Sequence, residues 1–295
     1  MIAALRLPLT NLPVMAPNPA PTIAFIGGGN MATSLIGGLI AAGADPRTLR
    51  VAEPDRARAA GLAERFGVIT ADAGSAIVSG ADAVVLAVKP QQLVSAVAPL
   101  TLDAGTTVLS IAAGVRVATL RAALGDAVHL VRSMPNTPAL YGCGISGLYA
   151  PAGTPDTARA LAQSILDAAG QTCWVDTEAD LDAVTAVSGS GPAYYFLLTE
   201  AIREAGEQLG LAPAVAAQLA ARTLVGAAKM VDAGTTDVAT LRQQVTSKGG
   251  TTEAALRHLE SAGLRPMFQA ALAAAAHRSR ELGDELAAPS PSPPH

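Results

Sequence analysis

Runs of consecutive apolar residues, separated by amphipathic stretches, constrain the fold of the first half of this chain. The runs are rich in Val, Ile, Leu and Ala and cover residues 22–27, 49–53, 82–88, 106–111 and 128–132. Since neighbouring strand residues point to opposite faces, a run that is apolar throughout predicts a strand buried on both faces of a parallel sheet. Helices are predicted between the runs, over residues 55–66, 91–100 and 117–124. This alternation predicts a Rossmann-type, doubly wound α/β domain over residues 21–177.

The strand signals stop after Asp176, and Ala- and Leu-rich stretches predict an all-α domain over residues 178–286. One predicted helix, residues 214–231, is apolar nearly all round and needs covering on several sides. We therefore expect an intertwined helical dimerisation domain. Residues 1–20 and 287–295 are predicted to be a disordered extension and a disordered, proline-rich tail.

Composition and charge exclude several partners. The net charge is -4 and no basic run is present, so we expect no nucleic-acid partner. Charged or polar residues interrupt every apolar stretch before about 18 residues accumulate, so no membrane span is expected, and the first 21 residues do not predict a signal peptide. The two cysteines, Cys143 and Cys173, suit free thiols in a reducing, cytoplasmic setting. The four histidines are scattered, and no metal site is expected.

A glycine-rich turn follows the first predicted strand and matches the pattern G-x-G-x-x-A. Gly27 permits the tight turn, Gly29 lets the backbone approach a pyrophosphate, and Ala32 allows close helix–strand contact. The alternative is an ordinary strand-to-helix turn. The predicted dinucleotide-binding residues here are Ile26, Gly27, Gly28, Gly29, Asn30, Met31 and Ala32.

The end of the second predicted strand carries two conflicting signals about the dinucleotide. Glu53 would accept a hydrogen bond from the ribose 2′-hydroxyl of NAD and repel a 2′-phosphate, whereas the nearby arginines, Arg56 and Arg58, would bind that phosphate. Alternatively, Glu53 or Asp55 only caps the next helix.

Further candidates lie at the carboxyl ends of other strands, where an open α/β sheet binds its ligand. The side chain of Lys89 faces a phosphate, holds a strand-end carbonyl, or is solvated. Asn136, in a loop stiffened by two prolines, binds the nicotinamide carboxamide or ties the loop to itself. Residues 188–193 join the site or form a hinge between the domains. The remaining cofactor candidates are Ala87, Val88, Pro90, Ile111, Ala112 and Ala113.

The stretch 245–256 places hydroxyls, two glycines and free backbone N–H groups at a helix N-terminus, which suits a small carboxylate. The alternative is that Thr251 or Thr252 caps its own helix. The candidate substrate-binding residues are Ser247, Gly249, Gly250, Thr251 and Thr252.

The motifs at 27–32, 88–90, 134–138, 188–194 and 249–252, taken in order, resemble pyrroline-5-carboxylate reductases over residues 22 to 285. The resemblance implies reduction of 1-pyrroline-5-carboxylate to L-proline with NADPH or NADH, the last step of proline biosynthesis. It also implies dimers with interlocked helical domains, which can build larger rings. Residues 27–32, 87–90 and 111–113 would line the dinucleotide, and Ser247 with residues 249–252 would form the substrate pocket.

The resemblance also suggests roles within that pocket. The Thr252 hydroxyl would serve the imine nitrogen as a hydrogen-bond donor, and Ser247 with the N–H groups of Gly250 and Thr251 would hold the carboxylate. Lys248 stands where the family usually has a proline, and we expect its side chain to point to solvent. NADPH is the favoured cofactor, with use of NADH as well.

Two other classes of protein fit parts of this sequence pattern. A β-hydroxyacid dehydrogenase also joins a Rossmann domain to helices, but it needs a helix lysine as acid, and Lys229 lies in an apolar helix. A nonenzymatic redox sensor would bind dinucleotide, but it does not require the polar loop at 246–252.

Overall fold

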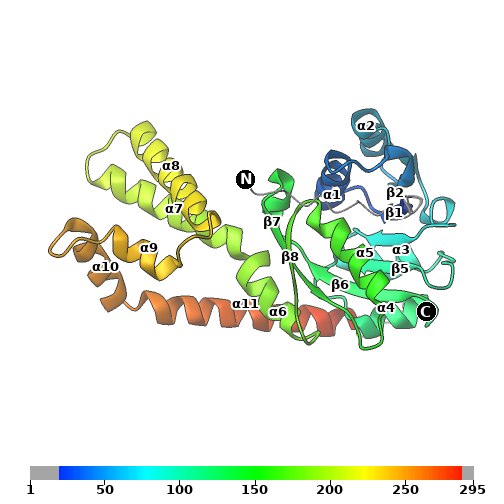
Figure 1. The fold of residues 1–295 in the computed structure, drawn as a ribbon. Helices are drawn as coiled ribbons and strands as arrows, with labels where there is room; N and C mark the ends of the chain where they lie inside the picture. The colour runs from blue at the N-terminus through cyan, green and yellow to red at the C-terminus, as the bar shows by residue number, and fades with distance from the viewer. Residues whose placement is uncertain (1–19, 288–295) are drawn as a thin grey trace, which may run out of the picture.

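The computed structural model describes residues 20–287, which form a sheet-containing half and a long helical arm (Figure 1). The predicted disordered segments lie outside this range apart from Ala20 and Ala287. One eight-stranded sheet has the order β3-β2-β1-β4-β5-β6-β7-β8. Its strands are β1 (Ile23–Ile26), β2 (Leu49–Ala52), β3 (Ile69–Ala71), β4 (Ala83–Leu86), β5 (Thr107–Ser110), β6 (His129–Met134), β7 (Gly144–Tyr149) and β8 (Gly170–Trp174).

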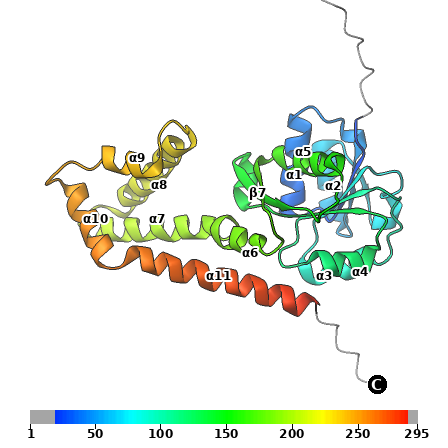
Figure 2. The ribbon, with the colours of Figure 1, turned by 60° about the horizontal axis from the view of Figure 1, so that its bottom comes forward.

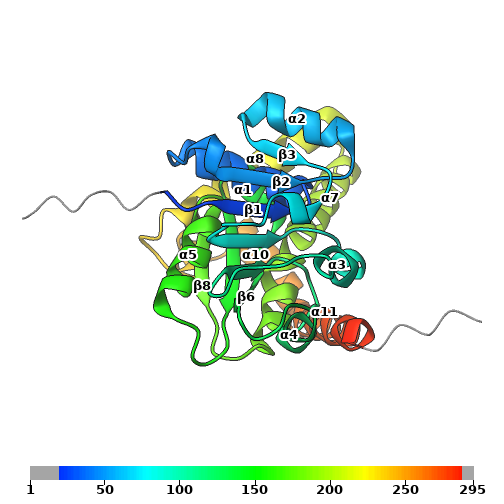
Figure 3. The same ribbon diagram turned by 90° about the vertical axis from the view of Figure 1, so that its right-hand side faces the viewer.

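Neighbouring strands are parallel except β6 and β7, which pair antiparallel. Helices cover both faces of the sheet, with α1 and α5 on one side and α3 and α4 on the other (Figure 3). The helices of this half are α1 (Asn30–Ala41), α2 (Arg56–Phe66), α3 (Pro90–Val97), α4 (Val117–Leu124) and α5 (Asp156–Asp167), with short 3-10 turns η1 (Pro46–Thr48), η2 (Gly74–Ala76) and η3 (Thr137–Tyr141).

The burial of β1 shows why its sequence is apolar at every position. Ile23 and Phe25 join the core that includes Leu35 of α1, whereas Ala24 and Ile26 join the core on the opposite face. A strand that contributes to two cores cannot alternate polar and apolar residues. The predicted α/β fold class is confirmed, and the five predicted runs are β1, β2, β4, β5 and β6.

The sequence analysis did not identify β3, β7 or β8. β3 has only three residues, at the edge of the sheet, and Ile69 is exposed. β7 contains Gly144 and Gly147, and glycine has little preference for strands. β8 lies at the other edge and alternates between half-buried and exposed residues, so it lacks the continuous apolar run that marked the central strands.

The second half is entirely helical. A π-helical turn, η4 (Thr185–Gly189), separates α6 (Asp180–Val184) from α7 (Gly191–Gln208). The other helices are α8 (Pro213–Asp232), α9 (Val238–Gln244), α10 (Thr251–Ser261) and α11 (Leu264–Ala287). Pro192 and Pro213 lie in the first turns of α7 and α8, where no helical hydrogen bond needs their missing N–H.

Helix α11 returns along the arm to the sheet-containing half (Figure 2). It packs on α6 and η4. Near its end, the Ser279 hydroxyl donates to Asp182 of α6, and Arg116 pairs with Asp284 at 2.8 Å. The second of these contacts attaches the arm to the sheet-containing half.

The arm buries very few of its apolar side chains within one chain. In α7 only Gly191 is buried, and in α8 only Ala216 and Ala220. Phe196 is 62% exposed and Leu197 66% exposed. By length and composition alone, α8 is also the single helix within residues 20–287 that would suit a membrane span. An apolar helical surface of this kind needs a partner to cover it.

Candidate functional site

The turn after β1 has the geometry of a phosphate-binding loop. Gly27 has φ +100°, and an added Cβ would lie 2.9 Å from the Ala87 carbonyl oxygen, so only glycine fits. Gly29 is the N-cap residue of α1, where no side chain caps the helix. An added Cβ at Gly29 would meet no atom within 4 Å, so the start of α1 has open space beside it. This arrangement fits a pyrophosphate.

The other predicted strand ends lie beside this turn. The Ala87 N–H donates to Ile26 at 2.8 Å, and the Ile111 N–H donates to Leu86 at 3.2 Å. The structure therefore brings the ends of β1, β4 and β5 together, with residues 26–32, 87–90 and 111–113, at one edge of the sheet. Lys89 is exposed there as the N-cap residue of α3.

Glu53 is 5% exposed, and its carboxylate is hydrogen-bonded to the glycine turn. Its Oε2 accepts from the Gly28 N–H and from Nη1 of Arg58, both at 3.0 Å, while Oε1 accepts from the Asp55 N–H. Arg56 is exposed at the start of α2. The sequence analysis weighed the arginines against Glu53 but did not anticipate that Arg58 pairs with Glu53.

Of the two residues considered as caps for α2, it is Asp55 that caps the helix. Its Oδ1 accepts from the N–H groups of Ala57 and Arg58. Glu53 is thus held by the glycine turn and by Arg58, while the helix terminus is satisfied separately.

Asn136 is 8% exposed, and both polar atoms of its amide have partners in the chain. Its Nδ2 donates to the Ser188 carbonyl at 3.2 Å, and its Oδ1 accepts from the Ile145 N–H at 3.0 Å. The loop-tying alternative therefore describes Asn136, and the expected contact with a carboxamide is not supported.

The predicted substrate loop connects α9 to α10. The N-cap residue of α10 is Gly250 and no side chain caps the helix, so the alternative that Thr251 or Thr252 is a cap is wrong. An added Cβ at Gly250 would collide with the Ser247 hydroxyl oxygen, which explains the glycine. Lys248 is exposed, as expected.

Two N–H groups of this loop have partners within it. The Gly249 N–H donates to the Glu253 carboxylate at 2.6 Å. The Gly250 N–H, predicted to hold a carboxylate, donates instead to the Ser247 carbonyl at 3.0 Å because residues 247–250 form a tight turn. The first N–H groups of α10 are then those of Thr251 and Thr252, at the positive end of the helix dipole.

The two sets of predicted site residues do not meet in one chain. Figures 1 and 2 place the loop between α9 and α10 at the far end of the arm from the carboxyl ends of β1 and β4. A pocket built from both sets therefore needs two copies of the chain.

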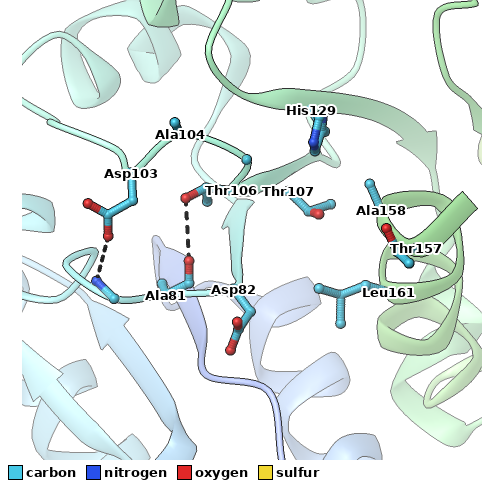
Figure 4. A pocket seen from close by; sticks show the side chains of 12 residues that line it. Ala81, Asp82, Asp103, Ala104, Thr106, Thr107, His129, Thr157, Ala158 and Leu161 are labelled. Carbon is cyan, nitrogen blue, oxygen red and sulfur yellow. Dashed lines mark hydrogen bonds between the residues drawn. The ribbon is translucent and has the colours of Figure 1, made fainter. Parts of the chain in front are cut away.

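A cavity of about 400 Å³ lies elsewhere in the sheet-containing half (Figure 4). Asp82, Thr107 and His129 line it at the amino ends of β4, β5 and β6, the edge opposite the glycine turn. Asp103 accepts there from the Gly80 N–H at 2.9 Å. The cavity is separate from the predicted site.

Residues 20–287 contain neither a metal centre nor a disulfide bond. Among the residues that the structure describes, no three His, Cys, Asp or Glu side chains gather as a metal site would require. Cys143 and Cys173 are unpaired and exposed.

Comparison with known proteins gives consistent results for both halves. Residues 178–282 match the family model for pyrroline-5-carboxylate reductase dimerisation, and residues 22–114 match that for coenzyme F420-dependent NADP oxidoreductases. The chain is 46% identical over 269 residues to a pyrroline-5-carboxylate reductase of Pseudomonas aeruginosa, covering 90% of this chain and 98% of the relative. The Haemophilus influenzae enzyme is 42% identical, covering 88% and 97%.

Solved structures give the same match. A pyrroline-5-carboxylate reductase from Coxiella burnetii superposes with a TM-score of 0.84 at 42% identity, over 89% of this chain and 98% of that one. A Plasmodium falciparum pyrroline carboxylate reductase with NADP bound superposes with a TM-score of 0.76 at 26% identity, over 89% and 98%.

Proposed function

Since this chain belongs to the pyrroline-5-carboxylate reductase family, we propose that it reduces 1-pyrroline-5-carboxylate to L-proline with NADPH or NADH, the last step of proline biosynthesis. The observation that carries this proposal is the 46% identity across 98% of a relative of that name. The fold adds independent support, because an uncapped helix terminus in one half and a hydroxyl-bearing loop in the other suit a dinucleotide and a small carboxylate. Because the chain belongs to this family, we do not favour the β-hydroxyacid dehydrogenase class, in which Lys229 would be the acid.

The dinucleotide supplies the hydride when bound, and the residues present fit it. The open space at Gly29 and the free N–H groups of α1 would hold the pyrophosphate. The other cofactor candidates, Ala87 to Pro90 and Ile111 to Ala113, would line the neighbouring strand ends.

We favour NADPH, with use of NADH as well. Arg58 neutralises the Glu53 carboxylate, so the repulsion of a 2′-phosphate is weakened. The exposed Arg56 offers a second positive charge. The NADP bound to the Plasmodium falciparum relative supports the same preference.

The substrate pocket would use Ser247, Gly249, Gly250, Thr251 and Thr252. The N–H groups at the start of α10 would bind the carboxylate with the Ser247 hydroxyl. Because Thr252 does not cap the helix, its hydroxyl is available to donate a hydrogen bond to the ring nitrogen as that nitrogen becomes an amine. Thr252 is the residue to which we assign a catalytic role.

Two chains would complete each site. The exposed apolar faces of α7 and α8 need a partner, and the matched dimerisation region contains both helices. In such a dimer the loop of one subunit would face the dinucleotide site of the other. Larger rings of dimers remain a prediction, and the two free thiols suit the proposed cytoplasmic location.

The direct test follows the loss of NADPH or NADH absorbance with 1-pyrroline-5-carboxylate, and the reverse reaction with proline at high pH. Gly29→Val is the matched control, because the added side chain enters open space and should fill the pyrophosphate site without unfolding the protein. Turnover by the wild type and its loss in the control are expected. Dinucleotide binding without turnover would favour the sensor class instead.

A further inference from the structure

A π-helical turn lies in the arm near its junction with the sheet-containing half. Between α6 and α7 the Ser190 N–H donates to the Thr185 carbonyl at 2.8 Å, a spacing of five residues. Such turns are rare and frequently lie at functional sites. They also shift the helical hydrogen-bond pattern by one residue, so nearby carbonyl groups need other donors.

Two side chains supply those donors here. The Tyr194 hydroxyl, from the first turns of α7, donates to the Ala186 carbonyl at 3.1 Å. Nδ2 of Asn136 donates to the Ser188 carbonyl at 3.2 Å. The first bond is local to the arm, whereas the second comes from the sheet-containing half.

Asn136 is also anchored within its own half. It lies two residues beyond the end of β6 and is the N-cap residue of η3. Its Oδ1 accepts from the Ile145 N–H of β7, so one buried amide joins the loop after β6, the strand β7 and the π-helical turn. Met134 supports the same junction, because an added Cβ at Gly189 would lie 2.5 Å from its methyl carbon.

We propose that Asn136 is a positioning residue for hydride transfer, one that fixes the direction of α7 relative to the carboxyl edge of the sheet. This rests on the proposed function. Helix α7 leads into the surface that a second subunit would cover, so its direction decides where the substrate loop of one chain stands against the dinucleotide site of the other. A misplacement of about 1 Å in such an arrangement lowers a rate by about a hundredfold.

Asn136→Asp tests this with a change of one atom. The carboxylate still accepts from the Ile145 N–H, but it can no longer donate to the Ser188 carbonyl. We expect kcat to fall by about tenfold to a hundredfold, while the Kd for NADPH, measured by calorimetric titration, changes by less than about twofold. A merely destabilised protein would not separate these two quantities.

A pH profile gives a second readout. Protonation of the carboxylate that Asn136→Asp introduces restores a donor for the Ser188 carbonyl, and burial at this position raises the pKa of a carboxyl group. The kcat of Asn136→Asp relative to wild type should therefore rise as the pH falls from about 8 to about 6. Using the ratio removes the pH dependence of the substrate itself.

Two further variants keep the proposal falsifiable. Tyr194→Phe removes the other hydrogen bond to the turn without changing the sheet-containing half, so it should also lower kcat. If Asn136→Asp does not fold, Tyr194→Phe tests the proposal in its place. Gln163→Glu makes the matched amide-to-acid change where Gln163 accepts from Trp174, away from the turn, and should leave kcat unchanged.

The proposal is overturned if Asn136→Asp keeps the wild-type kcat, or if NADPH affinity falls in parallel with kcat, since Asn136 would then act on the cofactor. Failure of the proposed function looks different, because the wild type itself would not turn over 1-pyrroline-5-carboxylate.

Discussion

Nη1 of Arg58 lies 3.0 Å from Oε2 of Glu53, and the same carboxylate oxygen accepts from the Gly28 N–H. The acidic residue at the end of β2 therefore has its charge paired and its position set before any dinucleotide binds. Glu53 contributes to the shape of the glycine turn, and Arg58 controls how much negative charge the turn presents.

The first prediction concerns cofactor choice. Arg58→Ala leaves the Glu53 charge unpaired, so the ratio of kcat/KM for NADPH to that for NADH should fall by about tenfold. Glu53→Gln should raise the ratio. Arg65→Ala, in the last turn of the same helix, is the matched control. If Arg56→Ala lowers the ratio while Arg58→Ala does not, the assignment to Arg58 is wrong.

The second prediction concerns the Thr252 hydroxyl. Thr252→Ala should lower kcat/KM by about 10²-fold or more, within the range typical of a positioned proton donor, and Thr252→Ser should retain most of the activity. Steady-state kinetics with saturating NADPH measure both. Full kcat/KM in Thr252→Ala would remove Thr252 from the mechanism.

The third prediction concerns the shared site. Co-expression of a Thr252→Ala subunit with a Gly29→Val subunit, each with its own tag, gives a mixed dimer with one intact site if the loop serves the partner. The isolated mixed dimer should then have about half the wild-type activity. Sites completed within one chain would leave it inactive, like the two parent variants.

The fourth prediction concerns Lys248. Its side chain is exposed, so Lys248→Pro should change the KM for 1-pyrroline-5-carboxylate by less than about tenfold, an effect of loop stiffness alone. A larger change, measured beside an unchanged KM for NADPH, would mean that the lysine acts on the substrate.

The fifth prediction concerns Asp237, the N-cap residue of α9. Hydrogen bonds from the Thr240 hydroxyl and backbone N–H lower the pKa of its carboxyl group below the ordinary value of 3.8. A lowered pKa in the folded state stabilises the protein above the unfolded pKa, and this is lost as the pH falls through the folded value. The wild type should therefore have a higher Tm than Asp237→Asn at neutral pH, and the difference should disappear as the pH falls below the ordinary pKa of 3.8 and through the folded-state pKa. A Tm difference that persists there would contradict this.

The sequence was sufficient to predict those structural features that depend only on neighbouring residues. The double burial of β1 and the tight turn at Gly27 each follow from a few neighbouring residues, and both were predicted. Asn136 was ambiguous because its partners, Ser188 and Ile145, are distant in sequence.

Other features depend on the three-dimensional placement of elements. Arg56 and Arg58 are equivalent in the sequence, and only the rotation of α2 decides which one reaches Glu53. The π-helical turn has no composition signal of its own, although residues 188–193 did mark a break between the halves. The antiparallel pairing of β7 with β6 likewise depends on the sheet as a whole.

The sparse burial of α7 and α8 has a thermodynamic consequence. An arm that lacks a core of its own gains most of its stability on association, so folding and assembly become one linked equilibrium. Dilution alone should then lower the melting temperature. The resistance of the protein to heat would depend on the total subunit concentration more than on the single polypeptide.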